Sequence, residues 1–198
     1  MRAILGFVLA LLAGGALFVY SGVFNVSARW EDPAWLAWLL ETVRERSIET
    51  RAEPIPVPRD LEDPARARRG LEHYAEMCQW CHGAPGEEES EIAKGLNPPP
   101  PQLAGREEEG EEHDPRELFW VIKNGIRMTG MPAWGPTHDD EELWDLVAAV
   151  RRLPELSPEA YRAATAAAER GGGHGHGHET SEAPGHEAGH DGGGHHEH

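Results

Sequence analysis

The two cysteines of the chain lie in one short motif, Cys78-Gln79-Trp80-Cys81-His82. Two thiols at this spacing can add to the two vinyl groups of one haem, while the adjacent histidine reaches the iron from the same side. The motif therefore predicts one covalently attached haem, held through Cys78 and Cys81, with His82 as a ligand of the iron.

Two other kinds of site use a similar spacing. A thioredoxin-like redox pair is expected to follow a strand in a βαβ unit, whereas a helical pattern leads into Cys78. A structural zinc site needs four ligands, and the chain has no second pair of cysteines. Both alternatives fit this sequence less well than haem attachment does.

A haem bound by one histidine needs a ligand on its other face. The chain has four methionines: Met1, Met77, Met128 and Met131. Met131 lies in a short loop with glycine and proline around it, which can present a thioether across a cavity. We expect Met131 to be the distal ligand, with Met128 as its competitor and the filling of a core gap as an alternative role for Met131. Ligation by a histidine would fall to His73, His113 or His138.

The elements that must position these residues begin with an apolar segment from Ala3 to Val23 that contains no charge. A helix of this length spans about 31 Å, which matches the hydrocarbon core of a bilayer. The apolar part of a cleaved signal peptide is shorter, so we expect a retained anchor, although Val26-Ser27-Ala28 could serve as a cleavage site. The positive charge of Arg2 favours the cytoplasmic side for the N-terminal end of this segment. The chain after the segment is then expected to be exported.

Five further helices are expected after the anchor, and no stretch alternates as a strand would. Their predicted starts are Asp32-Pro33, Asp63-Pro64, Asp114-Pro115, a capping box of Thr137 with Asp140, and Ser157-Pro158. Residues 53–59 should form an extended strap and residues 83–110 a loop. The predicted fold class is all-α, a helical domain around one haem. The predicted domains are an anchor (1–28), an amphipathic helix with strap (29–62), a haem domain (63–170) and a tail (171–198).

The helix that starts at Asp32-Pro33 has two possible roles. Three tryptophans, Trp30, Trp35 and Trp38, could anchor it at the depth of the lipid headgroups. The same amphipathic face could instead pack against the domain or against a partner subunit. The sequence alone does not separate these two roles.

The tail from Gly171 contains no bulky apolar residue and is predicted to be disordered. It holds eight histidines: His174, His176, His178, His186, His190, His195, His196 and His198. Neutral imidazoles at this density favour Zn, Cu or Ni, so we expect a metal site there, with a pH-responsive tail of weak metal affinity as the alternative. The formal net charge of -17 argues against a nucleic-acid partner.

Several motifs together resemble the class I c-type cytochromes, in particular the membrane-anchored monohaem cytochromes of bacterial respiratory chains. They are the cysteine motif after a glycine-containing helix, the Pro-x-Leu loop at Pro101, and the run N-G-I-R-M-T-G-M-P-A-W-G over residues 124–135. The resemblance covers about residues 63–156 and, more loosely, the tryptophan-rich stretch and the proline strap that precede them. It does not extend to the tail.

This resemblance implies thioether links at Cys78 and Cys81, with His82 as the proximal ligand and Met131 as the distal ligand. It implies that the carbonyl of Pro101 accepts a hydrogen bond from His82, although four consecutive prolines leave Pro100 as an alternative. Trp134 and Trp80 are expected at the haem edge, with core packing as an equal alternative. Gly70 and Tyr74 match the helix face that crosses the last core helix, near Trp144.

With both axial positions filled, no iron site is open to substrate, and the chain is expected to be an electron carrier and not an enzyme. The resemblance implies redox proteins as partners, a dehydrogenase or a terminal oxidase. It also implies a single-pass protein of the bacterial inner membrane with its haem domain in the periplasm. A metal-binding or metal-delivery protein that uses the tail is the alternative function. Acidic loops at Glu87–Glu91 and Glu107–Glu112 could steer a basic docking surface.

Overall fold

A computed structural model of the chain describes residues 1–105 and 113–171, and these residues contain helices and no strand. The predicted all-α class is therefore confirmed. The helices are α1 (Arg2–Ser21), α2 (Ala34–Ala52), α3 (Pro64–Met77), α4 (Gln79–His82), α5 (Glu91–Lys94), α6 (Pro115–Asn124), α7 (Asp140–Arg152), the 3₁₀ helix η1 (Leu153–Glu155) and α8 (Pro158–Gly171). The tail histidines predicted to bind metal lie outside the described residues.

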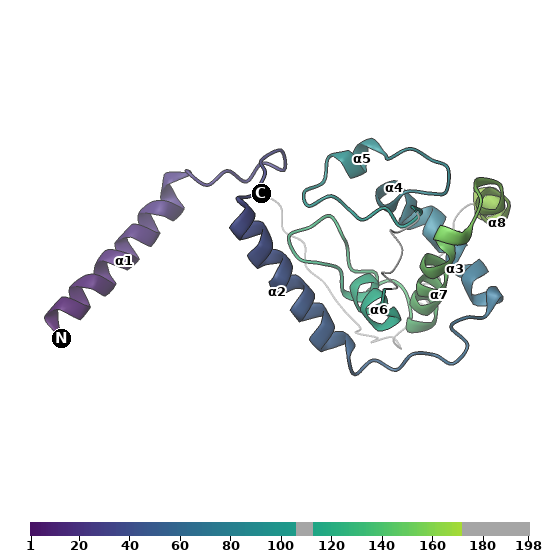
Figure 1. The fold of residues 1–198 in the computed structure, drawn as a ribbon, viewed down its shortest axis with the longest axis horizontal. Helices are drawn as coiled ribbons and strands as arrows, with labels where there is room; N and C mark the ends of the chain where they lie inside the picture. Colours follow the sequence, from purple (N-terminus) through teal and green to yellow (C-terminus); the bar gives the residue numbers. More distant parts are fainter. Residues whose placement is uncertain (106–112, 172–198) are drawn as a thin grey trace, which may run out of the picture.

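Helix α1 stands apart from the other helices, and all of its residues are exposed (Figure 1). Helix α2 lies along one side of the remaining helices and packs against α6. The predicted strap at residues 53–59 contains no helix; its residues 55–58 are irregular, and turns lie on either side of them.

Three predicted helix starts are confirmed by their side-chain caps. At the start of α8, the hydroxyl of Ser157 accepts a hydrogen bond from the N–H of Ala160 (3.2 Å). The other two caps are aspartates. Asp63 accepts a hydrogen bond from the backbone N–H of Ala65 (2.9 Å) at the start of α3. Asp114 does the same for Arg116 (2.9 Å) at the start of α6. In both helices a proline follows the cap, where its missing N–H costs nothing.

Three local predictions were wrong. The capping box of α7 is made by Asp139 with Glu142, because the hydroxyl of Thr137 instead bonds the carbonyl of Trp134. Asp32 does not cap α2, which starts after Pro33 without a side-chain cap. The predicted loop at 83–110 contains the short helix α5, which Ser90 caps.

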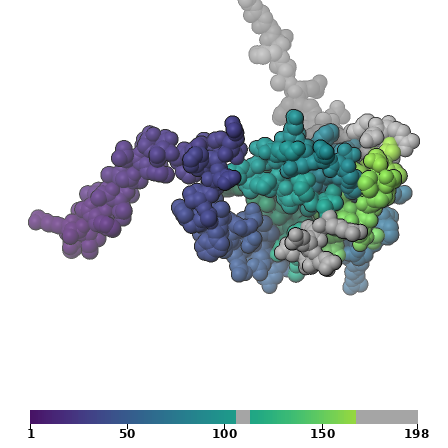
Figure 2. All heavy atoms as spheres, turned by 45° about the horizontal axis from the view of Figure 1, so that its top comes forward, coloured from purple at the N-terminus to yellow at the C-terminus, as the bar shows by residue number. Residues whose placement is uncertain are grey.

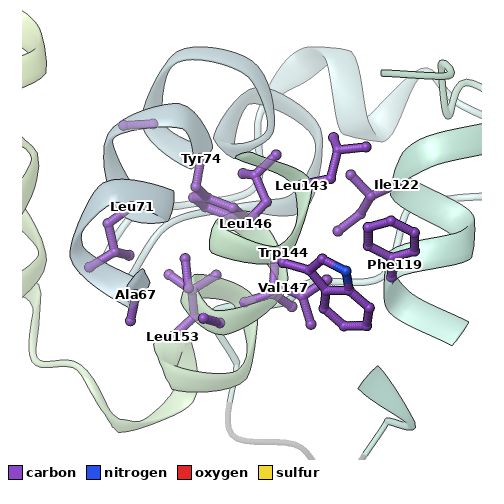
Figure 3. Packing of buried hydrophobic residues seen from close by; sticks show 14 of the residues in the cluster. Ala67, Leu71, Tyr74, Phe119, Ile122, Leu143, Trp144, Leu146, Val147 and Leu153 are labelled. Carbon is purple, nitrogen blue, oxygen red and sulfur yellow. The ribbon is translucent and has the colours of Figure 1, made fainter. Parts of the chain in front are cut away.

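The core forms where α3 crosses α7 (Figure 3). Buried side chains of α3 and α7 meet there, among them Leu71, Tyr74, Leu146 and Val147. Helix α6 adds Phe119, whose ring stacks on Trp144 at a centroid distance of 4.3 Å.

Gly70 allows the two helices to approach closely. A Cβ atom at this position would lie 1.9 Å from the carbonyl oxygen of Asp145 and 2.9 Å from the Cβ atom of Ala149. Such distances are far inside van der Waals contact, so only glycine fits. The predicted crossing of the Gly70 face over α7 is thus present, with its closest contact at Asp145, next to Trp144.

A buried ion-pair cluster lies beside this crossing. The carboxylate of Asp145 accepts hydrogen bonds from Arg66 (2.9 Å) and from Nε of Arg69 (2.6 Å). The second terminal nitrogen of Arg66 reaches Glu141 at 2.7 Å. Because removal of one partner from a buried pair leaves an uncompensated charge, this cluster favours one register of α3 on α7.

We predict that Gly70→Ala destabilises the fold by about 3 kcal/mol, because an added methyl group at the crossing must push two helices apart. Gly95→Ala is the matched control, since its nearest contacts would be ordinary ones at 3.5 Å. Urea unfolding followed by circular dichroism measures both. Equal unfolding midpoints for the two variants would contradict the role given to Gly70.

Candidate haem-binding site

A cleft that is partly open to solvent lies beside the α3–α7 core. Its walls come from α2, α3, α4, α6 and α7 and from the loops at residues 96–103 and 126–134. Most lining side chains are apolar; among them are Leu96, Leu103, Leu118, Val121, Ile122, Ile126, Leu146 and Val150. Figure 2 shows the helical body that contains the cleft, with α2 along one side of it.

The cysteine motif lies on one wall of this cleft. Helix α3 ends at Met77, and the N–H groups of Cys81 and His82 bond back to the carbonyl of Cys78 (3.1 and 2.9 Å). This single helical turn places positions i, i+3 and i+4 on one face. Cys78, Cys81 and His82 therefore all line the cleft.

Burial perturbs two groups of the motif. It raises the pKa of the Cys78 thiol to about 12, with a smaller contribution from Cys81. Burial also lowers the pKa of His82, against the effect of its hydrogen bond to the Pro101 carbonyl. His82 is thus held as the neutral imidazole that metals bind.

The orientation of His82 is set by the proline loop. Its Nδ1 atom lies 2.9 Å from the carbonyl oxygen of Pro101, so the acceptor is Pro101 and not Pro100. Because a carbonyl oxygen only accepts, Nδ1 carries the proton and Nε2 keeps its lone pair. The backbone N–H of Leu103 donates to the His82 carbonyl (3.0 Å), which closes the loop onto the motif.

Met131 lines the same cleft from the loop between α6 and α7, whereas Met128 does not. Met128 has a positive φ of 61° and is 92% exposed. The Met131 carbonyl accepts a hydrogen bond from the N–H of Ile126 (3.2 Å). The N–H of Met131 donates to the hydroxyl of Thr129 (3.1 Å). These bonds hold the loop around Met131 while Met128 points to solvent.

Gly125 lets this loop fold back on the end of α6. Its φ is 65°, and a Cβ atom there would lie 2.7 Å from the backbone nitrogen of Ala133 and 2.8 Å from the carbonyl oxygen of Met131. Both the left-handed backbone and the close approach require glycine. The Gly125 turn therefore brings Met131 to the cleft.

The other predicted site residues divide between the cleft and the surface. Trp134 lines the cleft, whereas Trp80 is 57% exposed and lies outside the lining. His73, His113 and His138 are also absent from the cleft walls. His138 is buried against the ring of Trp134, with the ring centroids 5.7 Å apart.

The cleft also contains residues that sequence reasoning missed. Arg44 of α2 lines it, as do Leu118 and Val121 of α6. The apolar periodicity of α6 could have indicated the latter two. No local pattern marks Arg44, because its place depends on how α2 packs against the domain.

The residues of the cleft fit a covalently bound haem. Two thiols, one imidazole nitrogen and two thioether sulfurs, that of Met131 and that of Met77 directly before Cys78, belong to a single cavity whose walls are otherwise mostly apolar. Thiols can form the tether, imidazole and thioether are both iron ligands, and an apolar cavity suits a flat macrocycle. In residues 1–105 and 113–171, no group of three or more His, Cys, Asp or Glu side chains is placed to hold a metal ion.

Comparison with known proteins agrees with this geometry. Residues 65–148 match the family model described as cytochrome c oxidase, cbb3-type, subunit III. No curated protein matches the chain. The matched segment contains the cysteine motif, Pro101 and Met131, whereas α2 with Arg44 precedes it.

We predict that Tyr74→Phe destabilises the folded chain by about 1–2 kcal/mol, because it leaves a partly buried carbonyl without its donor. The Tyr74 hydroxyl donates to the carbonyl of Gly83 (2.6 Å), directly after His82. Tyr161→Phe is the control, since its hydroxyl donates to the side-chain amide of Gln79, which can turn to water. Urea midpoints compare the variants, and a larger loss for Tyr161→Phe would count against this assignment.

Proposed function

We propose that this chain is a c-type cytochrome that transfers single electrons through one haem held by Cys78, Cys81, His82 and Met131, and the family match over residues 65–148 supports this proposal. The observation that carries this proposal is that one apolar cleft collects both thiols, the neutral imidazole and the thioether. The chain is an electron carrier or a subunit of an oxidase, and its cysteines, histidine and methionine serve binding and not turnover of a substrate.

When bound, the haem supplies an iron that alternates between Fe(II) and Fe(III). Cys78 and Cys81 tether the cofactor, so that its retention does not depend on non-covalent affinity. His82 and Met131 would both be ligands of the iron and would leave no position for oxygen or substrate. The apolar walls keep water away, which reduces the solvent rearrangement that accompanies each change of charge.

A membrane anchor is supported by α1. The helix has 20 residues and a mean hydropathy of 2.3 over its most apolar window, long and apolar enough to cross a bilayer. Arg2 lies at its N-terminal end, on the side expected to stay in the cytoplasm. We therefore propose a single-pass protein of the bacterial inner membrane with the haem domain in the periplasm.

We propose that helix α2 has both of the roles considered from the sequence. It packs against α6, and it also leaves Trp35 and Trp38 exposed. Trp30 is exposed as well, just before the helix. Tryptophan side chains are common at the membrane–water interface, so contact of α2 with headgroups stays a prediction.

Redox proteins are the proposed partners. The matched family model is described as an oxidase subunit, which favours a terminal oxidase as acceptor and a dehydrogenase or another carrier as donor. Glu87, Glu88, Glu89 and Glu91 are exposed and could steer a basic docking surface. A further run of acidic residues, Asp139 to Glu142, begins α7, where Asp139 and Glu142 form the capping box and need no partner protein. The cluster Glu107–Glu112 and the metal-binding tail lie outside the described residues, and their roles stay predictions.

We predict that the purified chain keeps its haem through extraction with acidified butanone, because thioether bonds survive that treatment. A variant with both Cys78→Ala and Cys81→Ala should release or lack the haem, and its pyridine haemochrome spectrum should show unsaturated vinyl groups in any haem retained. A colourless wild-type chain, expressed with a haem-attachment system present, would overturn the proposal.

We predict that Met131→Ala abolishes the far-red sulfur-to-iron absorption band of the ferric protein, because it removes the thioether ligand. Met128→Ala is the matched control and should keep the band, since Met128 lies in the same loop but faces solvent. Loss of the band in Met128→Ala, with the band kept in Met131→Ala, would show that Met128 is the distal ligand and would contradict the prediction. Absence of the band in the wild type would exclude methionine ligation.

A further inference from the structure

Among the described residues that line the cleft, Arg44 is the one side chain with a permanent charge. It comes from α2, which precedes the segment matched by the family model. A partly buried cation on the wall of an otherwise apolar cavity favours a bound group that brings an anion to that wall. Neither the tether nor the axial ligands of the proposed function use this residue.

Contacts at both ends hold α2 in place. Near its start, the side-chain amide of Asn97 donates to the carbonyl of Trp30 (3.1 Å), which joins α2 to the loop that forms part of the cleft. At its end, Arg116 of α6 donates to the carbonyl of Glu53 (3.4 Å), and Ala52 is buried. Because α2 also packs against α6, Arg44 in its middle is held at the cleft by the fold.

The protein partner of Arg44 is weak. Its guanidinium lies 3.3 Å from the carboxylate of Glu41, one helical turn earlier, and that carboxylate is exposed. Exposed pairs of this kind contribute little to stability. The Arg44 side chain is itself 35% exposed, so it is partly withdrawn from water, and this contact engages one edge of a group with five N–H donors.

We infer that Arg44 binds a carboxylate of the haem, one of the two propionate groups that the cofactor carries. This inference rests on the proposed function. A guanidinium presents a planar fork that matches a carboxylate with two parallel hydrogen bonds, which a lysine cannot reproduce. The exposed Glu41 pair can yield to such a partner at small cost. Arg44 is therefore a cofactor-binding residue supplied by α2, from outside the matched domain.

The charge of Arg44 also biases the redox equilibrium. A cation near the cofactor favours the state with one positive charge fewer, which is the reduced state. Because the cleft is mostly apolar, this interaction is less screened than one across the surface. Arg44 thus raises the reduction potential of the protein.

The experiment compares Arg44→Gln with Arg46→Gln in the full-length haem-loaded chain. Arg46 lies on the same helix and pairs with Glu49, but its side chain is 76% exposed. At the ambient potential where the wild type is half reduced, R44Q should show a reduced-to-oxidised ratio at least about threefold lower, a shift of about 28 mV. The shift should persist in 0.5 M salt, whereas R46Q should then titrate with the wild type because salt screens exposed charges.

Redox-induced infrared difference spectra provide a second readout that charge alone would not move. R44K keeps the positive charge but loses the fork, so it should keep most of the potential while shifting the propionate carboxylate bands. R46Q should leave those bands unchanged. R44K also remains informative if R44Q fails to fold.

The outcomes separate this inference from the proposed function. A chain without covalent haem would overturn the proposed function whatever Arg44 does. A haem-loaded R44Q that titrates with the wild type in high salt would overturn the role of Arg44 and leave the proposed function intact. Unchanged carboxylate bands in R44K would likewise overturn the propionate contact.

Discussion

Helix α3 approaches α7 until the backbone of Gly70 touches the carbonyl of Asp145, and this contact positions the haem-binding motif. The motif follows directly on the C-terminal end of α3, so any change in the crossing would move Cys78 and the turn after it. Two devices keep the crossing in register. The missing side chain at Gly70 sets the distance, and the charges around Asp145 select one alignment of the two helices.

The cleft follows from this crossing, because α3 and α7 together do not cover all of their apolar surface. Tyr74 and Leu146 belong to the core and also line the cleft. The loops on its other walls have no helical hydrogen-bond pattern, but a specific hydrogen bond fixes each of them. His82 bonds the carbonyl of Pro101 in one loop, and the N–H of Ile126 bonds the carbonyl of Met131 in the other. A domain of this size can bury only a limited apolar surface of its own. A covalently held flat ligand in the cleft would add to the buried apolar surface.

Much of the site could be predicted from the sequence, because its strongest signals are local. Cys78, Cys81 and His82 lie within one helical turn, and the Asp-Pro pairs at residues 63 and 114 specify helix starts that the structure confirms. Predictions failed where two neighbouring residues could both cap a helix, or where tertiary packing determines the place of a side chain. Thr137 and Asp139 can both cap a helix. Only the fold shows that the Thr137 hydroxyl donates its hydrogen bond to the carbonyl of Trp134. The place of Arg44 at the cleft is a consequence of tertiary packing, so no spacing in the sequence indicates it.

Helix α2 connects the segment that we assign to the membrane with the wall of the haem cleft, so it couples two parts of the chain that the family match leaves separate. The whole protein is strongly acidic, with a formal net charge of -17, and a uniform surface charge of that sign favours the oxidised state. Counterions reduce the effect of such charges beyond about 10 Å. One partly buried cation beside the cofactor acts at shorter range and through less water. The position of Arg44, and not the overall charge, is therefore the stronger influence on the potential of the bound haem.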